Sequence, residues 1–492
     1  MKTNLNLLLT LLLTLILLPF AYSQSNNNLR VVRGKTDTVT TSTHYVVGVA
    51  APGSSIYVND QPVKQYSTGS FGVELTLKEG DNPITVRATL GATDMSESFT
   101  VFYKKAILVP REDPITFFPK LVVKTKKGAY LNYGAGEDRL GGAKINFLAE
   151  GIKMELIDSM KNLYKVKLSE NTYAFIPKHL TDKVPFGVAP PYSLTSSWSV
   201  SNSGKADRVR ISLENRQPYT IHRDLDPNKL IIDIHGAACN SNWITQYLDL
   251  KAIDYVHLQQ RASDVFSVII KLKEAFSWGY TVDYVGNSLD ITIKHTPEAI
   301  ANAAKPSLKG LVFGVDAGHG GSASGAVSPS GIKEKDLNLD MVFMLKEELE
   351  KRGARVVLSR SEDVDVAMQE RLDIFKRENI DLMVSIHCNA GGNPLKPMGT
   401  STYYRHIEYR TLAEVILRRL LELDVINFGL VGNFNFSLNA PIEFPTVLVE
   451  TLFMSSLPDE AMIADSAFRR EMMVRVAKGL EDYVKLVKKG SR

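Results

Sequence analysis

The sequence predicts a multidomain chain in which three N-terminal all-β modules are followed by a C-terminal α/β domain, whose mostly parallel mixed sheet is flanked by helices. The chain has 492 residues, which is too long for one hydrophobic core at roughly 150 residues per domain. Short alternating strands separated by turn residues continue to about residue 295, as in all-β modules. Beyond residue 307 strands alternate with segments of helical periodicity, which indicates an α/β domain.

The first 23 residues have the composition of a secretory signal peptide. A positive end at Lys2 precedes a short apolar run from Leu7 to Phe20, and small residues lie at Ala21 and Ser23, where a signal peptidase would cleave. The alternative is a retained N-terminal anchor. No later segment reaches the roughly 20 apolar residues of a membrane span. We therefore expect an exported protein with no membrane span in the mature chain, located in the periplasm or, alternatively, in the cell wall or outside the cell.

The overall composition argues against a disordered chain and gives no support for nucleic-acid binding. The chain is 44% hydrophobic and 23% charged, which is ordinary for globular domains and excludes wholesale disorder. A net charge of +4 is too weak to predict nucleic-acid binding, although it is compatible with an anionic polymer. The two cysteines, Cys239 and Cys388, fall in different predicted domains, so we expect no disulfide.

Residues 24–105 form the first predicted module. Residues 71–77 and 84–88 alternate apolar and polar side chains, with a turn at 79–82 between them, which favours a small sandwich. The module resembles the immunoglobulin-like modules of exported bacterial proteins.

Two further β modules are predicted at 118–183 and 192–295. The strands of 118–183 resemble the SH3-like barrels attached to cell-wall enzymes, which often hold wall peptides; a spacer without a ligand is the alternative. The position of the next module and its strand at 230–234 resemble AMIN-type modules, which target wall amidases to peptidoglycan or to division sites. Residues 296–307, rich in proline and alanine, are predicted to be a linker.

The last domain is predicted at 308–488. Apolar residues recur at helical spacing in four segments, and buried strands precede or separate them. The predicted helices are 336–352, 367–377, 408–423 and 467–487, and the predicted strands are 311–316, 356–358, 381–386, 402–404 and 447–449.

Four ionisable side chains follow predicted strands or begin a predicted helix in this domain. His319 and His387 follow two strands, and Glu334 lies where a helical pattern starts. Two imidazoles and a carboxylate are the ligand set of a catalytic zinc ion, with a fourth position for water. Glu450, at the end of another strand, is the candidate base that takes the proton of this water. The sequence therefore predicts a zinc hydrolase.

Each of these residues has an ordinary alternative when taken alone. His319 could be a loop residue, Glu334 a helix-start carboxylate, His387 a core histidine, and Glu450 a buried acid paired with an arginine. Because all four are predicted at strand ends or at a helix start, a shared functional site is favoured over four separate structural roles. Two further residues are predicted to support it: Asp316, which could orient a ligand histidine, and Asn389, which could contact substrate. We also considered as ligands Asp316 itself, Asp381, His406 and Glu443, whose placement converges less.

Motifs around these residues resemble the amidase-3 family of zinc-dependent N-acetylmuramoyl-L-alanine amidases. They are Val-Asp-Ala-Gly-His-Gly-Gly at 315–321, Gly-Ile-Lys-Glu-Lys-Asp-Leu-Asn-Leu at 331–339, Val-Val-Leu-Ser-Arg at 356–360, Gln-Glu-Arg at 369–371, Ser-Ile-His-Cys-Asn-Ala at 385–390 and Pro-Thr-Val-Leu-Val-Glu at 445–450. The resemblance implies that His319, Glu334 and His387 bind Zn²⁺, that Glu450 is catalytic, and that the chain cuts peptidoglycan between N-acetylmuramic acid and L-alanine of the stem peptide. Residues 433–441 match the family only loosely, which leaves the substrate contacts there open.

Two other functions were weighed against amidase activity. One is a catalytically silent protein that binds the wall or activates a partner; the presence of all four site residues argues against it. The other is a zinc peptidase that cuts within the stem peptide. The expected partner is peptidoglycan, in wall remodelling or daughter-cell separation, and a protein activator is left open as a second partner.

Overall fold

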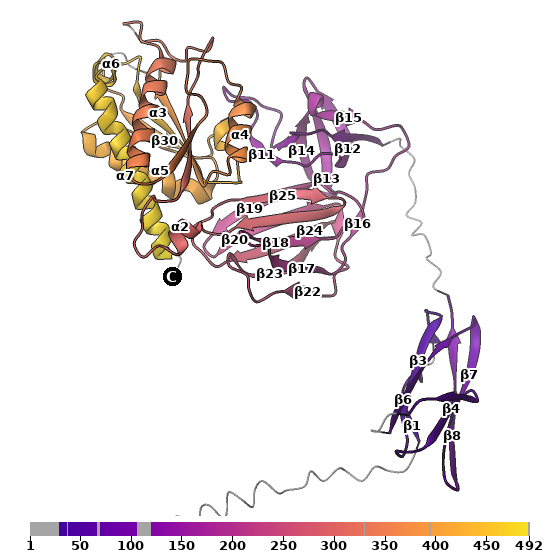
Figure 1. Ribbon diagram of the computed structural model, residues 1–492. Helices are drawn as coiled ribbons and strands as arrows, with labels where there is room; N and C mark the ends of the chain where they lie inside the picture. Colours follow the sequence, from indigo (N-terminus) through magenta and orange to yellow (C-terminus); the bar gives the residue numbers. More distant parts are fainter. Residues whose placement is uncertain are drawn as a thin grey trace, which may run out of the picture. The chain divides into compact units, whose positions relative to one another are not determined.

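The structure is a computed structural model that describes residues 29–36, 38–65, 69–105, 120–328, 330–392 and 395–490. The predicted signal peptide and the spacer after it lie outside the described residues. The chain divides into two compact units, one ending at Phe117 and one beginning at Phe118 (Figure 1). Among the described helices, none is long and apolar enough to cross a membrane.

The first unit consists of two sheets around one core. Their strand orders are β1-β3-β6 and β2-β8-β7-β4-β5. Val46 and Phe71 from the first sheet pack with Ile84 and Val101 from the second. The bounds are β1 Arg30–Arg33, β2 Thr38–Val39, β3 Thr43–Val49, β4 Ser55–Val58, β5 Gln61–Val63, β6 Ser70–Thr76, β7 Gly80–Leu90 and β8 Thr93–Tyr103.

The second unit begins with a seven-stranded sheet, ordered β11-β10-β14-β13-β12-β9-β15, which is called the barrel module below. Its strands are β9 Leu121–Thr125, β10 Tyr130–Asn132, β11 Lys144–Phe147, β12 Lys153–Met160, β13 Leu163–Ser169, β14 Thr172–Pro177 and β15 Thr181–Lys183, with the short helix η1 Lys178–Leu180 before β15. The turn between β10 and β11 contacts the α/β domain, where Asn435 Nδ2 donates to the backbone oxygen of Gly142 at 2.7 Å.

The third module has two main sheets, ordered β22-β17-β18-β26-β25 and β19-β20-β24-β23, and a short β16-β21 pair. Its strands are β16 Ser193–Leu194, β17 Trp198–Asn202, β18 Ala206–Ile211, β19 Tyr219–Leu225, β20 Asn228–His235, β21 Ala237–Ala238, β22 Ile244–Gln246, β23 Ile253–Ala262, β24 Val265–Leu272, β25 Tyr280–Val285 and β26 Ser288–Lys294.

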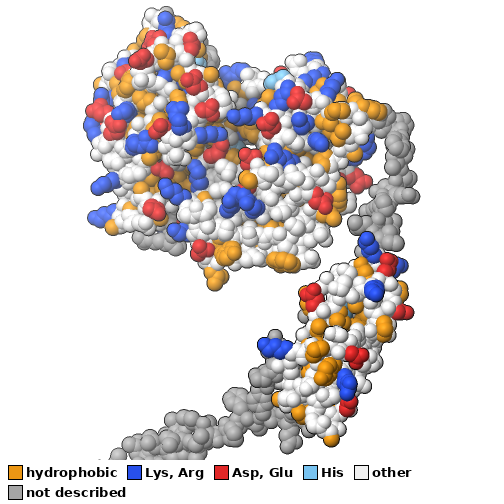
Figure 2. Space-filling view, turned by 45° about the vertical axis from the view of Figure 1, so that its right-hand side comes forward, with side chains coloured by type: hydrophobic (Ala, Val, Ile, Leu, Met, Phe, Trp, Pro, Cys, Tyr) orange, Lys and Arg blue, Asp and Glu red, His pale blue; other side chains and the backbone are white. Residues whose placement is uncertain are grey.

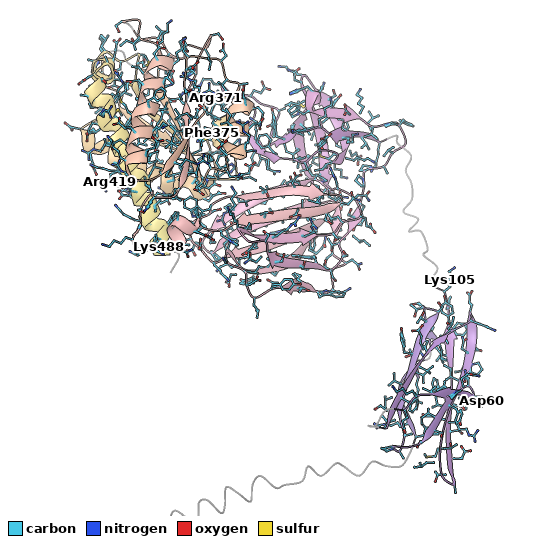
Figure 3. The ribbon with its side chains drawn as sticks, viewed as in Figure 1. Asp60, Lys105, Arg371, Phe375, Arg419 and Lys488 are labelled. Atoms are coloured by element: carbon cyan, nitrogen blue, oxygen red, sulfur yellow. The ribbon has the colours of Figure 1, made fainter. Side chains whose placement is uncertain are left out.

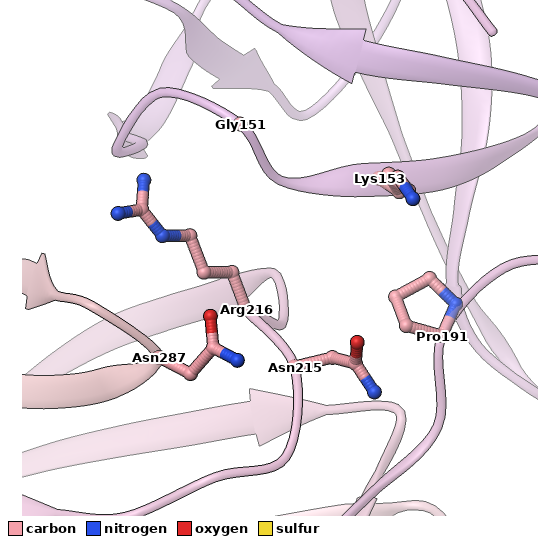
Figure 4. Close-up of a pocket in the computed structure, with 6 residues that line it drawn as sticks. All are labelled: Gly151, Lys153, Pro191, Asn215, Arg216 and Asn287. Atoms are coloured by element: carbon pink, nitrogen blue, oxygen red, sulfur yellow. The ribbon is translucent and has the colours of Figure 1, made fainter.

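The barrel and third modules share one hydrophobic core. Val123 and Ile176 of the barrel belong to the same buried cluster as Ile232 and Phe266 of the third module. Beside this core lies a pocket of about 260 Å³ in which Arg216 extends from the third module toward the barrel (Figure 4). Its guanidinium donates to the carbonyl oxygens of Glu150, at 2.6 Å, and of Gly286, at 2.8 Å, so this pocket is a polar junction between the modules.

The C-terminal α/β domain has a six-stranded mixed sheet ordered β28-β27-β29-β32-β30-β31. The first four strands are parallel, and β30 is antiparallel to β32. The C-terminal domain is therefore an α/β domain, as predicted. The strands are β27 Val312–Ala317, β28 Arg355–Leu358, β29 Leu382–Asn389, β30 Thr400–Tyr403, β31 Asn427–Val431 and β32 Thr446–Phe453.

Helices cover both faces of this sheet (Figure 1). On one face, α7 contacts both α3 and α5, and these helices pack against alternate residues of the strands, such as Val384 and Ile386. On the other face lies α4, whose Phe375 packs with Met383. The helices are α3 Glu334–Lys351, α4 Met368–Arg377, α5 Arg410–Leu420, α6 Leu457–Ala464 and α7 Ser466–Gly490, with short helices η2 Ile407–Tyr409, η3 Leu421–Leu423 and η4 Ser437–Asn439.

Residues 296–307, the predicted linker, are packed against this domain. They include α2 Glu298–Ala301, and the side chain of Ile300 is fully buried in the core of the α/β domain. Trp278 of the third module joins the same core, with its ring centroid 6.0 Å from that of Tyr483 in α7. The barrel module, the third module and the α/β domain therefore meet through packed surfaces.

Candidate active site

Three parallel strands bring the predicted site residues to one edge of the sheet. His319 follows β27, His387 lies near the end of β29, and Glu450 lies in β32 directly beside His387 in the strand register. Glu334 is the first residue of α3. Because the carboxyl ends of parallel strands meet at one edge, residues far apart in sequence converge there.

His319, Glu334 and His387 form a compact cluster of possible metal ligands. One ligand atom from each lies within 4.8 Å of those of the other two. Glu334 Oε1 is 3.1 Å from His319 Nε2 and 3.0 Å from His387 Nδ1. No other described group of His, Cys, Asp and Glu side chains has this geometry. The structure thus brings together the three side chains that the sequence predicted as ligands.

Two glycines leave the space that this cluster needs. A Cβ atom at Gly318 would lie 2.3–2.6 Å from the ring atoms of His387, and one at Gly325 would lie 2.5 Å from Glu334 Oε2. Both distances are shorter than real Cβ contacts. His319 itself adopts a positive φ of 63°, which is uncommon for a residue other than glycine. The turn between β27 and α3 is therefore shaped around the imidazoles and the carboxylate.

Hydrogen bonds hold the Glu334 carboxylate in its charged form. Oε1 also accepts from the backbone N–H of Cys388, at 3.1 Å, and Oε2 accepts from that of Ala326, at 2.8 Å. Burial raises the pKa of Glu334, but hydrogen bonds and charges from His319 and His387 outweigh it and lower the pKa well below its ordinary value. A buried carboxylate that stays ionised is suited to bind a cation.

Two buried arginines fix the turn that carries His319. Arg371, at the start of α4 (Figure 3), donates to the backbone oxygens of Ala317, at 2.6 Å, and His319, at 2.7 Å. Arg360 donates to the backbone oxygens of Ala317, at 3.0 Å, and Gly318, at 3.1 Å. Both residues belong to motifs noted in the sequence, but their role as backbone clamps was not predicted.

Asp316 supports this turn through Arg371. Its fully buried carboxylate accepts from Arg371 Nη1, at 2.9 Å, and from Ser385 Oγ, at 2.6 Å. Burial raises the pKa of Asp316, but the charges of Arg371 and His387 and nearby hydroxyl groups lower it overall. Within the described residues Asp316 makes no hydrogen bond to either ligand histidine, so its link to His319 runs through the arginine and the backbone.

Cys388 points to the opposite face of the sheet from His387. Its Sγ lies 3.3 Å from Thr451 Oγ1 and 3.6 Å from Asn338 Oδ1 of α3. Burial raises the pKa of the thiol well above its ordinary value, so the thiol stays protonated. Cys388 and Cys239 are both free, as the sequence predicted.

Glu450 is placed and protonated differently from Glu334. Its Oε2 atom is buried and has no hydrogen-bond partner among the described residues. Burial raises its pKa to about 7, and the charge of Glu334 acts in the same direction, against His387 and Arg139. A carboxyl group with a pKa near neutrality can both take and return a proton.

Aromatic residues form a wall beside this acid, which is called the aromatic wall below. The ring of Phe436 lies edge-on to that of His387, with centroids 5.8 Å apart, and Phe434 lies 4.6 Å from Tyr403. Asn389, the predicted substrate contact, donates to the Tyr403 hydroxyl at 3.2 Å. The sequence left this part of the site open because the wall comes from a loop after β31 and from β30.

The other residues considered as ligands lie outside the cluster. Asp381 precedes β29, at the opposite edge of the sheet, and accepts from the backbone N–H of Val312 at 2.8 Å. His406 Nε2 is 3.0 Å from the backbone oxygen of Ala440, and Glu443 pairs with Lys376 at 2.5 Å.

The chemistry of the cluster fits a zinc ion. Two imidazoles and one ionised carboxylate are an established ligand set for catalytic zinc. Two buried polar atoms near them, His387 Nε2 and Glu450 Oε2, have no hydrogen-bond partner within the described part of the chain. Such orphaned atoms in a buried polar site are expected where an ion or a water molecule completes the structure.

Comparison with known proteins identifies the α/β domain. Residues 314–482 match the family model described as N-acetylmuramoyl-L-alanine amidase. The chain is 26% identical to the N-acetylmuramoyl-L-alanine amidase AmiC of Neisseria meningitidis serogroup B over 253 residues, covering 41% of this chain and 61% of AmiC. It is 31% identical to LytC of Bacillus subtilis strain 168, an amidase of the same name, over 204 residues, covering 40% of each chain.

A solved structure is also similar in sequence. The amidase AmiC2 of Nostoc punctiforme is 31% identical, with 36% of this chain and 97% of that chain covered and a TM-score of 0.34. The matches to AmiC and LytC span 61% and 40% of those proteins.

Proposed function

Because the chain belongs, through its C-terminal domain, to the N-acetylmuramoyl-L-alanine amidase family, we propose that it is a zinc-dependent hydrolase that cuts peptidoglycan between N-acetylmuramic acid and L-alanine. The observation that carries this proposal is the meeting of His319, Glu334 and His387 within 4.8 Å, next to Glu450. This is a metal-ligand set with an acid–base group beside it.

His319, Glu334 and His387 would hold the ion. Bound zinc would supply positive charge that acidifies a water molecule and polarises the scissile carbonyl. Glu334 would contribute a carboxylate that remains ionised. Arg360 and Arg371 would keep His319 in place through their bonds to the backbone of its turn.

Glu450 would move the protons of the reaction. Its carboxylate accepts the proton of the attacking water and returns it to the nitrogen of the leaving L-alanine, which departs as an amine. The buried Oε2 atom is the available acceptor. The aromatic wall beside it would exclude bulk water from the reacting groups.

We propose that the protein is exported and that the mature protein cleaves this substrate in the periplasm. The N-terminal residues have signal-peptide composition, and relatives include a protein named a probable cell wall amidase. A protein activator remains a prediction, as do wall targeting by the β modules and a role in daughter-cell separation.

Digestion of purified peptidoglycan tests the proposal. The mature full-length chain is incubated with peptidoglycan, with and without a chelator, and the products are identified by mass spectrometry. We expect intact stem peptides with a free L-alanine amine, and loss of this product with chelator and its return with added zinc. Cleavage within the stem would instead indicate a peptidase, and binding without any product would indicate a catalytically silent wall-binding protein.

A further inference from the structure

The loop that carries two rings of the aromatic wall is hydrogen-bonded to the barrel module. This loop, residues 432–436, follows β31, and the barrel edge strand β11 lies next to the α/β domain (Figure 1). Asn435 Nδ2 donates to the backbone oxygens of Gly142, at 2.7 Å, and Leu140, at 3.4 Å. Its Oδ1 atom accepts from Lys144 Nζ at 3.3 Å. One side-chain amide of the α/β domain therefore bonds to three residues of the barrel module.

The buried guanidinium of Arg405 takes part in the same contact. Arg405 follows β30 and is 9% exposed. It donates to Asn435 Oδ1, at 3.1 Å, and to the backbone oxygen of Lys144, at 3.3 Å. Within the described residues it forms no ion pair with a carboxylate, so these hydrogen bonds offset the cost of burying its charge. Because its acceptors come from both modules, Arg405 favours one arrangement of the loop against the barrel.

The residues on either side of Asn435 reach the site. The ring centroid of Phe434 lies 4.6 Å from that of Tyr403. The ring of Phe436 lies perpendicular to that of His387, a candidate metal ligand, with centroids 5.8 Å apart. Because the three loop residues are consecutive, a displacement of Asn435 would move both rings of the loop.

The barrel module supplies most of the contacts of the Asn435 side chain. Three of its four described hydrogen-bond partners belong to the barrel and one to the α/β domain. The barrel turn is itself closed by two backbone hydrogen bonds between Asp138 and Gly141, at 3.2 and 3.0 Å. The loop is therefore fixed against an ordered partner in the other module.

We propose that Asn435 is a positioning residue through which the barrel module holds the aromatic wall in place for substrate binding. This inference rests on the proposed amidase function. Asn435 makes no described hydrogen bond to the candidate metal ligands or to Glu450, and it acts through the rings beside it. The barrel module is thereby part of the substrate site.

The test measures kcat and KM on a soluble muramoyl peptide with the mature full-length, zinc-loaded chain. The variants are Asn435→Ala, Lys144→Met and the double variant. Arg216→Met is the matched control, because Arg216 also bonds to the barrel, at the backbone oxygen of Glu150, but at the junction with the third module. Zinc content and the thermal midpoint are recorded for every chain.

For Asn435→Ala we expect kcat/KM to fall about tenfold, mainly through a raised KM. Zinc content should be unchanged, because the candidate ligands keep their own contacts. Lys144→Met should raise KM less, and it should add little in the double variant, since the bond that it removes is already absent. Arg216→Met should keep the wild-type kinetic constants, whatever its effect on the thermal midpoint.

A further pair of chains shows whether Asn435 acts through the aromatic wall. Asn435→Ala is introduced into a chain that already carries Phe436→Ala. We expect a smaller increase in KM than in the wild-type background, because one of the two rings that Asn435 positions is already missing. An equal increase in both backgrounds would overturn the inference.

The outcomes separate the inference from the function on which it rests. If the wild type releases no peptide with a free L-alanine amine, the proposed function fails and the inference with it. If the wild type is active but Asn435→Ala keeps its KM, or if Arg216→Met raises KM equally, only the inference fails. Loss of zinc from Asn435→Ala would place its effect on the metal ligands and also overturn the inference. Should Asn435→Ala fail to fold, Lys144→Met against Arg216→Met decides by the same criteria.

Discussion

At the scale of single residues, the two acids of the site differ because their neighbours differ. Glu334 has two histidines and two backbone N–H groups against its oxygens, so its negative charge is stabilised. Glu450 has a buried oxygen with no partner within the described structure, and burial raises its pKa to about 7. One acid is thereby suited to binding a cation and the other to proton transfer.

Removal of the acid function at residue 450 should stop turnover without loss of the metal. We expect Glu450→Gln to lower kcat about 10²–10⁴-fold, the usual contribution of a positioned general base. Zinc content, measured by mass spectrometry of the dialysed protein, should be unchanged, because Glu450 is outside the ligand cluster. A variant that keeps full activity would show that another group takes the proton.

The pKa of Glu450 also predicts a pH dependence of stability in the metal-free protein. The folded-state value of about 7 lies above the roughly 4.3 expected for an unfolded glutamate. Between these values the folded chain binds more protons than the unfolded chain, so its stability falls as the pH rises through this window. We expect Glu450→Gln to unfold at the wild-type temperature at pH 4.5 and at a higher one at pH 8, a difference that calorimetry in the presence of chelator would detect. A pH-independent difference between the two proteins would contradict the raised pKa.

The candidate metal ligands and the candidate acid–base residue could be predicted from the sequence. The roles of the residues that hold them in position could be predicted only in part. His319, Glu334, His387 and Glu450 each follow a recognisable strand or begin a helix, and the structure brings them together. Arg360 and Arg371 stand in recognisable motifs, but only the folded structure shows that they donate to the backbone of the His319 turn.

At the scale of elements, α4 contributes to the site through one arginine. Arg371 joins α4 to the end of β27 by its ion pair with Asp316 and its bonds to two backbone oxygens. Both partners of this ion pair are almost fully buried. Loss of one partner would leave the other as a buried, uncompensated charge.

We therefore expect Arg371→Met to destabilise the α/β domain by about 3–5 kcal/mol and to weaken zinc binding through the loosened His319 turn. The double variant Arg371→Met with Asp316→Asn should recover part of the stability, since it removes both charges. Thermal unfolding and competitive zinc titration of the wild type, both single variants and the double variant would measure this coupling. Additive effects of the two substitutions would contradict a direct pairing.

The element predictions failed where the sequence pattern is short. The helices of the α/β domain were predicted within a few residues of α3, α4, α5 and α7, because their apolar residues recur over several turns. The eight-residue helix α6 and the edge strand β31 were not predicted. Ser456, whose hydroxyl caps α6, and the proline in its first turn were the available signals for that helix.

At the scale of the whole molecule, the predicted boundaries between the barrel module, the third module and the α/β domain do not mark independent cores. Alternation of apolar and polar residues predicts that one face of a strand is buried, but not which module covers it. Contacts between modules, which this alternation does not reveal, form the shared core of the barrel and third modules. They also bury Ile300 and Trp278 in the α/β domain. The surface carries basic and acidic side chains interspersed on the visible face (Figure 2), in keeping with a net charge of only +4.

Two shortened chains test this organisation. A chain beginning at Phe118 lacks only the first compact unit, so we expect it to keep the thermal midpoint of the second unit and its activity on soluble muramoyl peptides. A chain beginning at Tyr192 lacks the barrel module, which exposes the apolar side chains of the third module that pack on Val123 and Ile176. Because this burial stabilises the fold in proportion to its area, we expect the midpoint to fall by about 5 °C or more, together with a raised KM. Equal midpoints for the two shortened chains would show that the barrel contributes nothing to the stability of its neighbours, whereas a lower midpoint with unchanged kinetics would limit its role to folding.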